Sequence, residues 1–133
     1  MRIFLKTLAM AAGLLAAFSL PAAEAPPRAE TLAEKTLKDI VARQRDIFAR
    51  ADKEGDNLDM ARLRGELQSV IHSYDVLIQK SPDFAPAYVT YGLLLGQVGM
   101  TREAVGILLK ANKLDAEIPV VKNEIARFLA EDG

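Results

Sequence analysis

Two apolar helical patterns separated by a single glycine constrain this 133-residue chain more than any other feature. Apolar residues recur at intervals of three and four on both sides of Gly99, which places each set on one helix face. Gly99 suits the left-handed conformation that ends a helix, and Thr101 is expected to cap the next one. Because the loop is so short, we predict an antiparallel helical hairpin. The periodic positions are Tyr88, Tyr91, Leu95 and Val98, followed by Ala104, Leu108, Ala111 and Leu114.

These residues resemble a tetratricopeptide repeat (TPR), a unit of about 34 residues that folds as helix, turn and helix. If Ala85 is the first position of the repeat, the chain matches the positions at which the family has an aromatic residue, a small residue, a large apolar residue, the turn glycine and the characteristic alanine. In the same register, Pro82 falls on the proline that closes the preceding repeat. The resemblance is good for residues 82–114. The matches are Tyr88, Gly92, Leu95, Gly99, Ala104, Leu108 and Ala111, with Tyr74 and Leu77 in the preceding unit, and the departures are Tyr91, Gly106 and Ala116.

The remaining sequence predicts three further helices. A capping box at Thr31–Glu34 begins the first, and the turn-forming residues Glu54–Asn57 end it. The second runs from about Leu58 to Ser81, where a proline follows, and the third ends near Ala130. Their predicted inward faces are Leu37, Ile40, Val41, Gln44, Ile47, Phe48 and Ala51; then Leu63, Leu67, Val70, Ile71, Tyr74, Leu77 and Ile78; and then Val121, Ile125, Phe128 and Leu129.

The fold class predicted from these patterns is all-α, with about five helices after a signal peptide. The resemblance implies that antiparallel hairpins stack in the right-handed manner of TPR proteins. We divide the mature chain into a long N-terminal helical hairpin at residues 31–81, a TPR-like hairpin at 82–116 and a C-terminal capping helix at 117–133. The long first hairpin is either an elongated relative of the repeat or an unrelated partner packed against it.

Residues 1–25 have the pattern of a signal peptide. Arg2 and Lys6 precede an uncharged, largely apolar run, and small residues follow at positions 22–25, where cleavage is expected. The run is too short to span a bilayer comfortably. Residues 26–30 are expected to form an extended linker. We therefore predict an exported protein, periplasmic or secreted, from a Gram-negative-type bacterium. Membrane attachment is expected only through the signal peptide, if it is not cleaved.

Composition excludes several kinds of partner and chemistry. The net charge is −1 and the basic residues are interspersed with acidic ones, so a nucleic-acid partner is not expected. The chain contains no cysteine, which rules out disulfides, thiol catalysis, cysteine-bound metals and a lipoprotein anchor. No glycine-rich phosphate loop is present, and no cofactor is expected.

Two polar clusters resemble functional motifs without meeting their requirements. The acidic residues from Asp52 to Asp59 do not form a complete calcium loop, since the sixth and twelfth places hold Asn57 and Leu63. Ser69, His72 and Asp75 have the residue types of a hydrolase triad but are spaced along one helix, without free backbone donors for an oxyanion hole. We predict no catalytic residue and no metal site.

The TPR resemblance implies a function in protein binding, because the first helix of each family unit lines a groove that holds a peptide or helix. Two interpretations remain open: this groove binds an apolar partner segment, or the first hairpin fills it and these residues are core. We predict an exported scaffold or adaptor module without catalysis. The alternatives are a self-assembling structural subunit, which forms a homo-oligomer, and a hydrolase that uses Ser69 or His72. The groove positions carried over are Pro86, Val89, Leu93, Gly96 and Gln97, with Val120, Asn123 and Arg127 in the last helix.

Overall fold

The computed structural model describes residues 28–132, and these are helical apart from short connections. The predicted signal peptide and the first two linker residues lie outside the described residues. Among residues 28–132 there are five α-helices and no strand, which confirms the all-α prediction. The helices are α3 (Leu32–Glu54), α4 (Met60–Lys80), α5 (Ala85–Gln97), α6 (Thr101–Leu114) and α7 (Pro119–Asp132), with a 3-10 turn, η1, at Gly55–Asn57.

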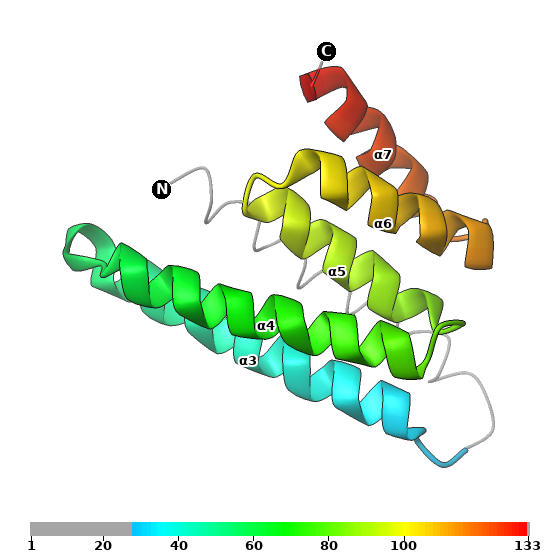
Figure 1. Cartoon of the computed structure of the whole chain (residues 1–133), viewed down its shortest axis with the longest axis horizontal. Coiled ribbons are helices and arrows are strands. Elements are labelled where there is room, and N and C mark those ends of the chain that lie inside the picture. Colours follow the sequence, from blue (N-terminus) through cyan, green and yellow to red (C-terminus); the bar gives the residue numbers. More distant parts are fainter. Residues whose placement is uncertain (1–27, 133) are drawn as a thin grey trace.

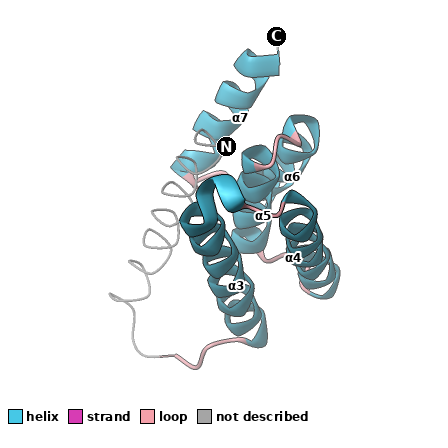
Figure 2. Ribbon diagram, turned by 90° about the vertical axis from the view of Figure 1, so that its left-hand side faces the viewer, coloured by secondary structure: helices cyan, strands magenta, loops and turns pink. Residues whose placement is uncertain are grey.

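The helices form layers that follow the order of the chain (Figure 1). The long helices α3 and α4 lie side by side as the first layer, α5 and α6 form the second, and α7 forms the third. Figure 2, seen from the side, shows the same order. The contacts between elements follow it too, because α5 packs on α4 and α6, and α7 packs chiefly on α6.

Local sequence signals explain where the first two helices begin. The Thr31 hydroxyl accepts a hydrogen bond from the Glu34 amide at 3.1 Å, and the Glu34 carboxylate accepts one from the Thr31 amide at 2.8 Å, so the predicted capping box is present. All seven residues of the predicted inward face of α3 are buried. The second helix starts at Met60 rather than near Leu58, because the Asp59 carboxylate caps it by accepting from the Arg62 amide at 3.1 Å.

In the turn between α5 and α6, Gly99 has the predicted left-handed conformation, but Thr101 is not the predicted N-cap of α6. Gly99 has a φ of 84°, the left-handed conformation expected of it. The Met100 amide donates to the Leu95 carbonyl at 2.9 Å and the Gly99 amide to the Gly96 carbonyl at 3.2 Å, which is the bonding pattern of a Schellman cap. Thr101 does not cap α6. It is the first helical residue, and Met100 precedes it without a side-chain cap.

Helix α5 is buried on almost every side, so the single inward face predicted for it was incomplete. Tyr88, Tyr91 and Leu95 of that face are buried and Val98 is half-buried, but every other residue from Ala87 to Leu94 is buried as well. These residues are buried because α5 lies between the first and third layers and packs on α6 as well. Gly92 allows the close approach to α6, because a Cβ there would lie 2.6 Å from Leu108 Cγ.

A small polar network lies inside the junction of the first two layers. The Tyr74 hydroxyl, fully buried on α4, donates to Gln44 Oε1 of α3 at 2.8 Å. The Tyr74 ring stacks on Tyr91 of α5 with centroids 5.2 Å apart and planes within 7°. Burial raises the pKa of the Tyr74 hydroxyl well above its usual value, which keeps it a donor. This network explains why Gln44, a polar residue, lies on the inward face of α3.

We expect Tyr74→Phe to lower the free energy of unfolding by about 1–3 kcal/mol, because it leaves the buried Gln44 amide without its donor. The double variant Tyr74→Phe/Gln44→Met should recover most of this loss, since both polar partners are then replaced by apolar groups of similar shape. Urea unfolding of the four species, followed by far-UV circular dichroism, measures both effects. Additive losses in the double variant would contradict the assignment of this bond.

Candidate functional site

The predicted groove positions of α5 are largely covered in the structure. Val89 and Leu93 belong to the hydrophobic core, with 0% and 6% of their surface exposed, and Pro86 is half-buried. Of the two interpretations left open by the sequence, core burial therefore describes Val89 and Leu93. Neither side chain presents an open apolar surface to a partner.

Gly96 lies where another part of the chain comes close, and that part is the Phe128 ring of α7. A Cβ built at Gly96 would lie 2.1 Å from Phe128 Cζ and within 3 Å of two further ring carbons. Phe128 is itself 2% exposed. The missing side chain at position 96 thus provides the space in which α7 attaches to α5.

Three further positions of the predicted groove differ in their surroundings. Gln97 is half-buried, and its amide oxygen and nitrogen have no hydrogen-bond partner among the described residues. Val120 is half-buried, and Asn123 is exposed.

Arg127 is already held by its own helix. Its guanidinium donates to the Glu124 carboxylate at 3.1 Å and to the Glu131 carboxylate at 2.8 Å, and it lies 4.4 Å from the centre of the Phe128 ring. The hydrogen bond with Glu124 raises the pKa of Arg127 above its usual value. A partner's carboxylate would have to displace these ion pairs to bind Arg127.

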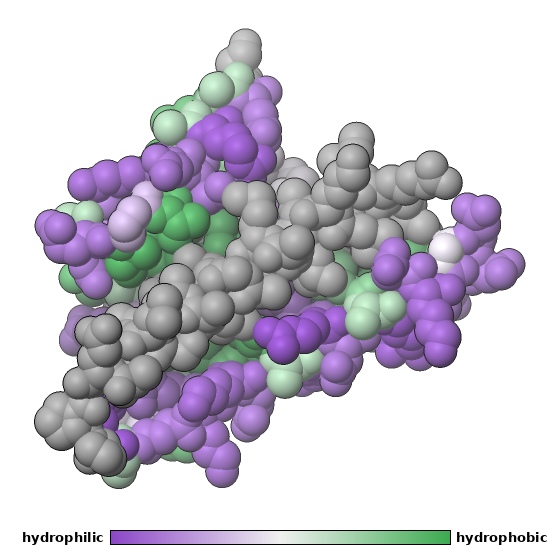
Figure 3. All heavy atoms as spheres, turned by 180° about the vertical axis from the view of Figure 1, so that it is seen from behind, coloured by the Kyte–Doolittle hydropathy of each residue, from purple (hydrophilic) through white to green (hydrophobic). Residues whose placement is uncertain are grey.

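The outer side of α7 differs from the prediction that Leu129 faces inward. Leu129 is 57% exposed and Ile125 is half-buried, whereas Val121 and Phe128 are buried as expected. Figure 3 shows hydrophobic side chains among the charged ones at the end of the molecule that holds α7. The sequence pattern did not predict this exposed edge, because it does not tell how many sides of a terminal helix are covered.

A comparison of α7 with α5 gives the physical reason. The two helices begin 34 residues apart, at Ala85 and Pro119, and at this offset Ala126 corresponds to Gly92 and Leu129 to Leu95. Gly92 packs against Leu108 of α6, whereas Ala126 is exposed. The side of α7 that corresponds to the α6-facing side of α5 is thus covered by no other helix of residues 28–132.

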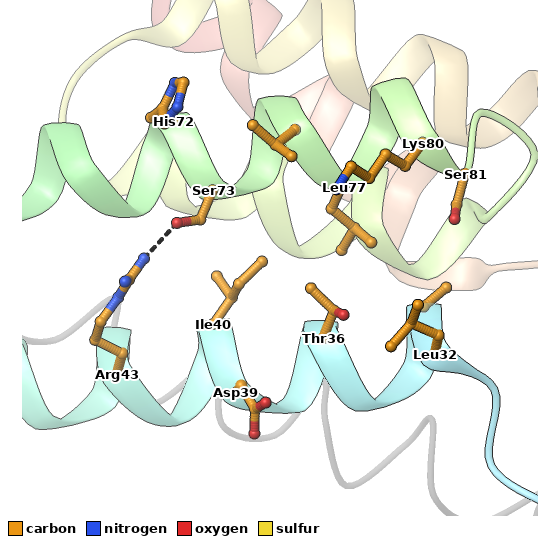
Figure 4. Close-up of a pocket in the computed structure, with 12 residues that line it drawn as sticks. Leu32, Thr36, Asp39, Ile40, Arg43, His72, Ser73, Leu77, Lys80 and Ser81 are labelled. Carbon is orange, nitrogen blue, oxygen red and sulfur yellow. Dashed lines mark hydrogen bonds between the residues drawn. The ribbon is translucent and has the colours of Figure 1, made fainter.

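A groove between α3 and α4 provides the best candidate site (Figure 4). It has a volume of about 730 Å³, and none of its described lining residues comes from α5, α6 or α7. Its floor is apolar, with Ile40 and Leu77 buried and Val76 half-buried, and Leu32 at one end is 80% exposed. The full lining is Leu32, Ala33, Thr36, Asp39, Ile40, Arg43, His72, Ser73, Val76, Leu77, Lys80 and Ser81.

The charged side chains around this α3–α4 groove are mostly basic. Arg43 lies toward one end and Lys80 toward the other, and neither forms an ion pair within residues 28–132. Arg43 donates instead to the Ser73 hydroxyl across the groove. Asp39, the only acidic residue of the described lining, points away from α4 (Figure 4). The groove therefore offers two cationic groups that have no carboxylate partner within the described residues.

Sequence reasoning missed this groove. The signal that could have revealed it is the presence of apolar side chains outside the predicted inward faces. Leu32 and Val76 are such residues, and both line the groove. Their significance depends on the spacing between α3 and α4, which a pattern within one helix does not determine.

The residues of the triad-like cluster serve other interactions. The Asp75 carboxylate accepts a hydrogen bond from the Tyr91 hydroxyl at 2.8 Å, and the Ser69 carbonyl accepts one from the Ser73 hydroxyl at 3.0 Å. His72 is exposed at the edge of the groove. Among the described residues, no hydrogen bond joins the Ser69, His72 and Asp75 side chains to one another, as a nucleophile, base and orienting acid would require.

The acidic turn is likewise used in folding. Asp59 caps α4, and Glu54 forms ion pairs with Arg50 and Arg62 at 3.7 Å each. Within residues 28–132, no group of three histidine, cysteine or acidic side chains is placed to hold a metal ion. No helix in the same range has both the length and the apolar character that a bilayer crossing requires.

Comparison with known proteins gives no relative from which to transfer a function. The chain matches no protein-family model, and neither the characterised proteins nor the solved structures contain a significant match to it.

We expect Gly96→Ala to weaken the attachment of α7, because the added methyl group would overlap the buried Phe128 ring. The cost should be about 1–3 kcal/mol, typical of overpacking. Hydrogen exchange should show faster exchange in α7, with little change in α3. Gly106→Ala is the matched control, since nothing lies within 4 Å of a Cβ at that exposed helical position. Unchanged exchange of α7 in Gly96→Ala would contradict this account.

Proposed function

We propose that this chain is an exported protein-interaction module that binds an apolar segment of a partner, peptide or helix, and performs no chemistry of its own. The α3–α4 groove carries the proposal, because it combines an apolar floor with two cationic groups, Arg43 and Lys80, that form no ion pair among the described residues. Its accessible apolar surface comes from Leu32, which is 80% exposed, and from half-buried Val76. Exposed apolar surface bordered by polar residues is typical of protein interaction sites. The partner surface proposed here therefore differs from the α5 positions suggested by the sequence.

The proposal includes a TPR-like stacking of antiparallel hairpins. Several observations support it. Gly99 has the left-handed conformation of a turn glycine, Gly92 allows close contact with α6, and Ala104 is fully buried. Helix α7 begins at Pro119, 34 residues after α5 begins at Ala85, and this spacing agrees with the length of such a repeat.

Export remains part of the proposal and rests on the signal-peptide pattern of residues 1–25. The compartment proposed is the periplasm, or the outside of the cell. Attachment to a membrane is proposed only through this segment if it is not cleaved, and no nucleic acid is proposed as a partner.

Paired capture experiments with the tagged full chain test the binding function. Leu32→Glu places a charge at the apolar end of the groove and should abolish capture of a specific protein from a cell-envelope extract. Leu32 is 80% exposed in the first turn of α3, where glutamate is well tolerated, so the variant should fold. Ala49→Glu, on the exposed side of α3 outside the groove, should leave capture unchanged. Equal capture by both variants would contradict a role for the groove.

Self-assembly is a second candidate, favoured by the uncovered side of α7. Exposed Leu129 and half-buried Ile125 lie where a further helix could pack, and a second copy could supply it.

If the chain self-assembles through α7, light scattering of the unmodified chain should give a molecular mass above that of the monomer. The Leu129→Asp variant should give the mass of the monomer. Ala130→Asp introduces the same charge at a neighbouring exposed position and should leave the assembly intact. A monomer at all concentrations in the unmodified chain would rule out this alternative.

A further inference from the structure

We propose that the α3–α4 groove holds one amphipathic helix of a partner protein, with its apolar stripe on the groove floor and acidic side chains against Arg43 and Lys80. This inference rests on the proposed function and specifies its partner. Its support comes from the backbone chemistry, the floor and the charges of the groove.

The backbone chemistry of the groove favours a helical occupant. Both walls are α-helices, whose amides and carbonyls bond within their own helix. An extended segment laid on this apolar floor would bury its own amides and carbonyls without partners, at a cost for each. A helix satisfies its backbone internally and presents only side chains to the floor.

The floor has the length and shape for a short apolar stripe. Along α3, the lining runs from Leu32 to Arg43, a rise of roughly 16 Å at about 1.5 Å per residue. About three turns of an occupant helix match this length. Side chains spaced by three and four on the occupant would then meet Leu32, Ala33 and Val76, the apolar lining residues that are not buried.

The charges of the groove favour an acidic occupant. Arg43 and Lys80 are exposed, lie toward opposite ends and have no ion pair within the described residues. His72 adds no negative charge to the edge, and Asp39 points away from α4. An occupant with glutamate on both sides of its stripe would pair with these cations, whereas one with lysine would be repelled.

Two synthetic helical peptides serve as probes for this inference. Both carry the same leucine stripe over three turns, flanked by glutamates in one and by lysines in the other. Fluorescence anisotropy against the full chain at low salt should show at least about tenfold tighter binding of the glutamate peptide, and its affinity should fall as salt is added.

Charge reversal tests whether Arg43 and Lys80 cause the preference for the glutamate peptide. Arg43→Glu/Lys80→Glu should weaken binding of the glutamate peptide by about tenfold and strengthen binding of the lysine peptide. Arg45→Glu/Arg64→Glu is the matched control, since it makes the same change in net charge at exposed arginines outside the groove. This control should retain the preference for the glutamate peptide, and circular dichroism verifies that both double variants are folded.

Several results would overturn the inference. Equal affinity for both peptides, or the same loss in both double variants, would show that Arg43 and Lys80 do not select the occupant. Binding to anionic lipid vesicles in place of either peptide would assign the groove to a membrane surface. Dissociation of a homo-oligomer by Leu32→Glu would assign it to a second copy. If neither peptide binds while Leu32→Glu still abolishes capture from the extract, the inference fails and the proposed function stands.

Discussion

The burial of α5 is the constraint on which the rest of the structure depends. A helix that is apolar all round is stable only if neighbours cover all its sides. Here α4 covers one side through the stacked rings of Tyr74 and Tyr91, and α6 covers another through the close contact of Gly92 with Leu108. The Phe128 ring of α7 fills the space left at Gly96. The order of the layers follows from this requirement.

The surfaces at the two ends of the layered structure consequently differ in their side chains and shape. At the first layer, the long helices α3 and α4 leave a groove with an apolar floor and with cations that form no ion pair in the described chain. At the last layer, α7 is a single helix whose outer side keeps Leu129 in solvent. Leu32, Arg43 and Lys80 at the groove and Leu129 on α7 are exposed, so substitutions at these positions leave the buried contacts of α5 in place.

The sequence predicted most of the fold because its strongest signals are local. The capping box at Thr31, the inward face of α3 and the left-handed Gly99 each follow from the chemistry of a few neighbouring residues. Errors arose where burial depends on other helices, as at Leu129, which no helix of the described chain covers. The groove was missed for the same reason, because Leu32 and Val76 become one surface only when α3 and α4 lie side by side.

The sequential order of the layers also bears on how quickly the chain can acquire its structure. Its major helix contacts join elements that follow one another along the chain, so few distant segments have to find each other. Proteins dominated by such local contacts reach the native state within roughly microseconds to milliseconds. A chain that is synthesised one segment at a time could therefore fold each helix pair as it appears, and its apolar α5 would be exposed to aggregation only briefly.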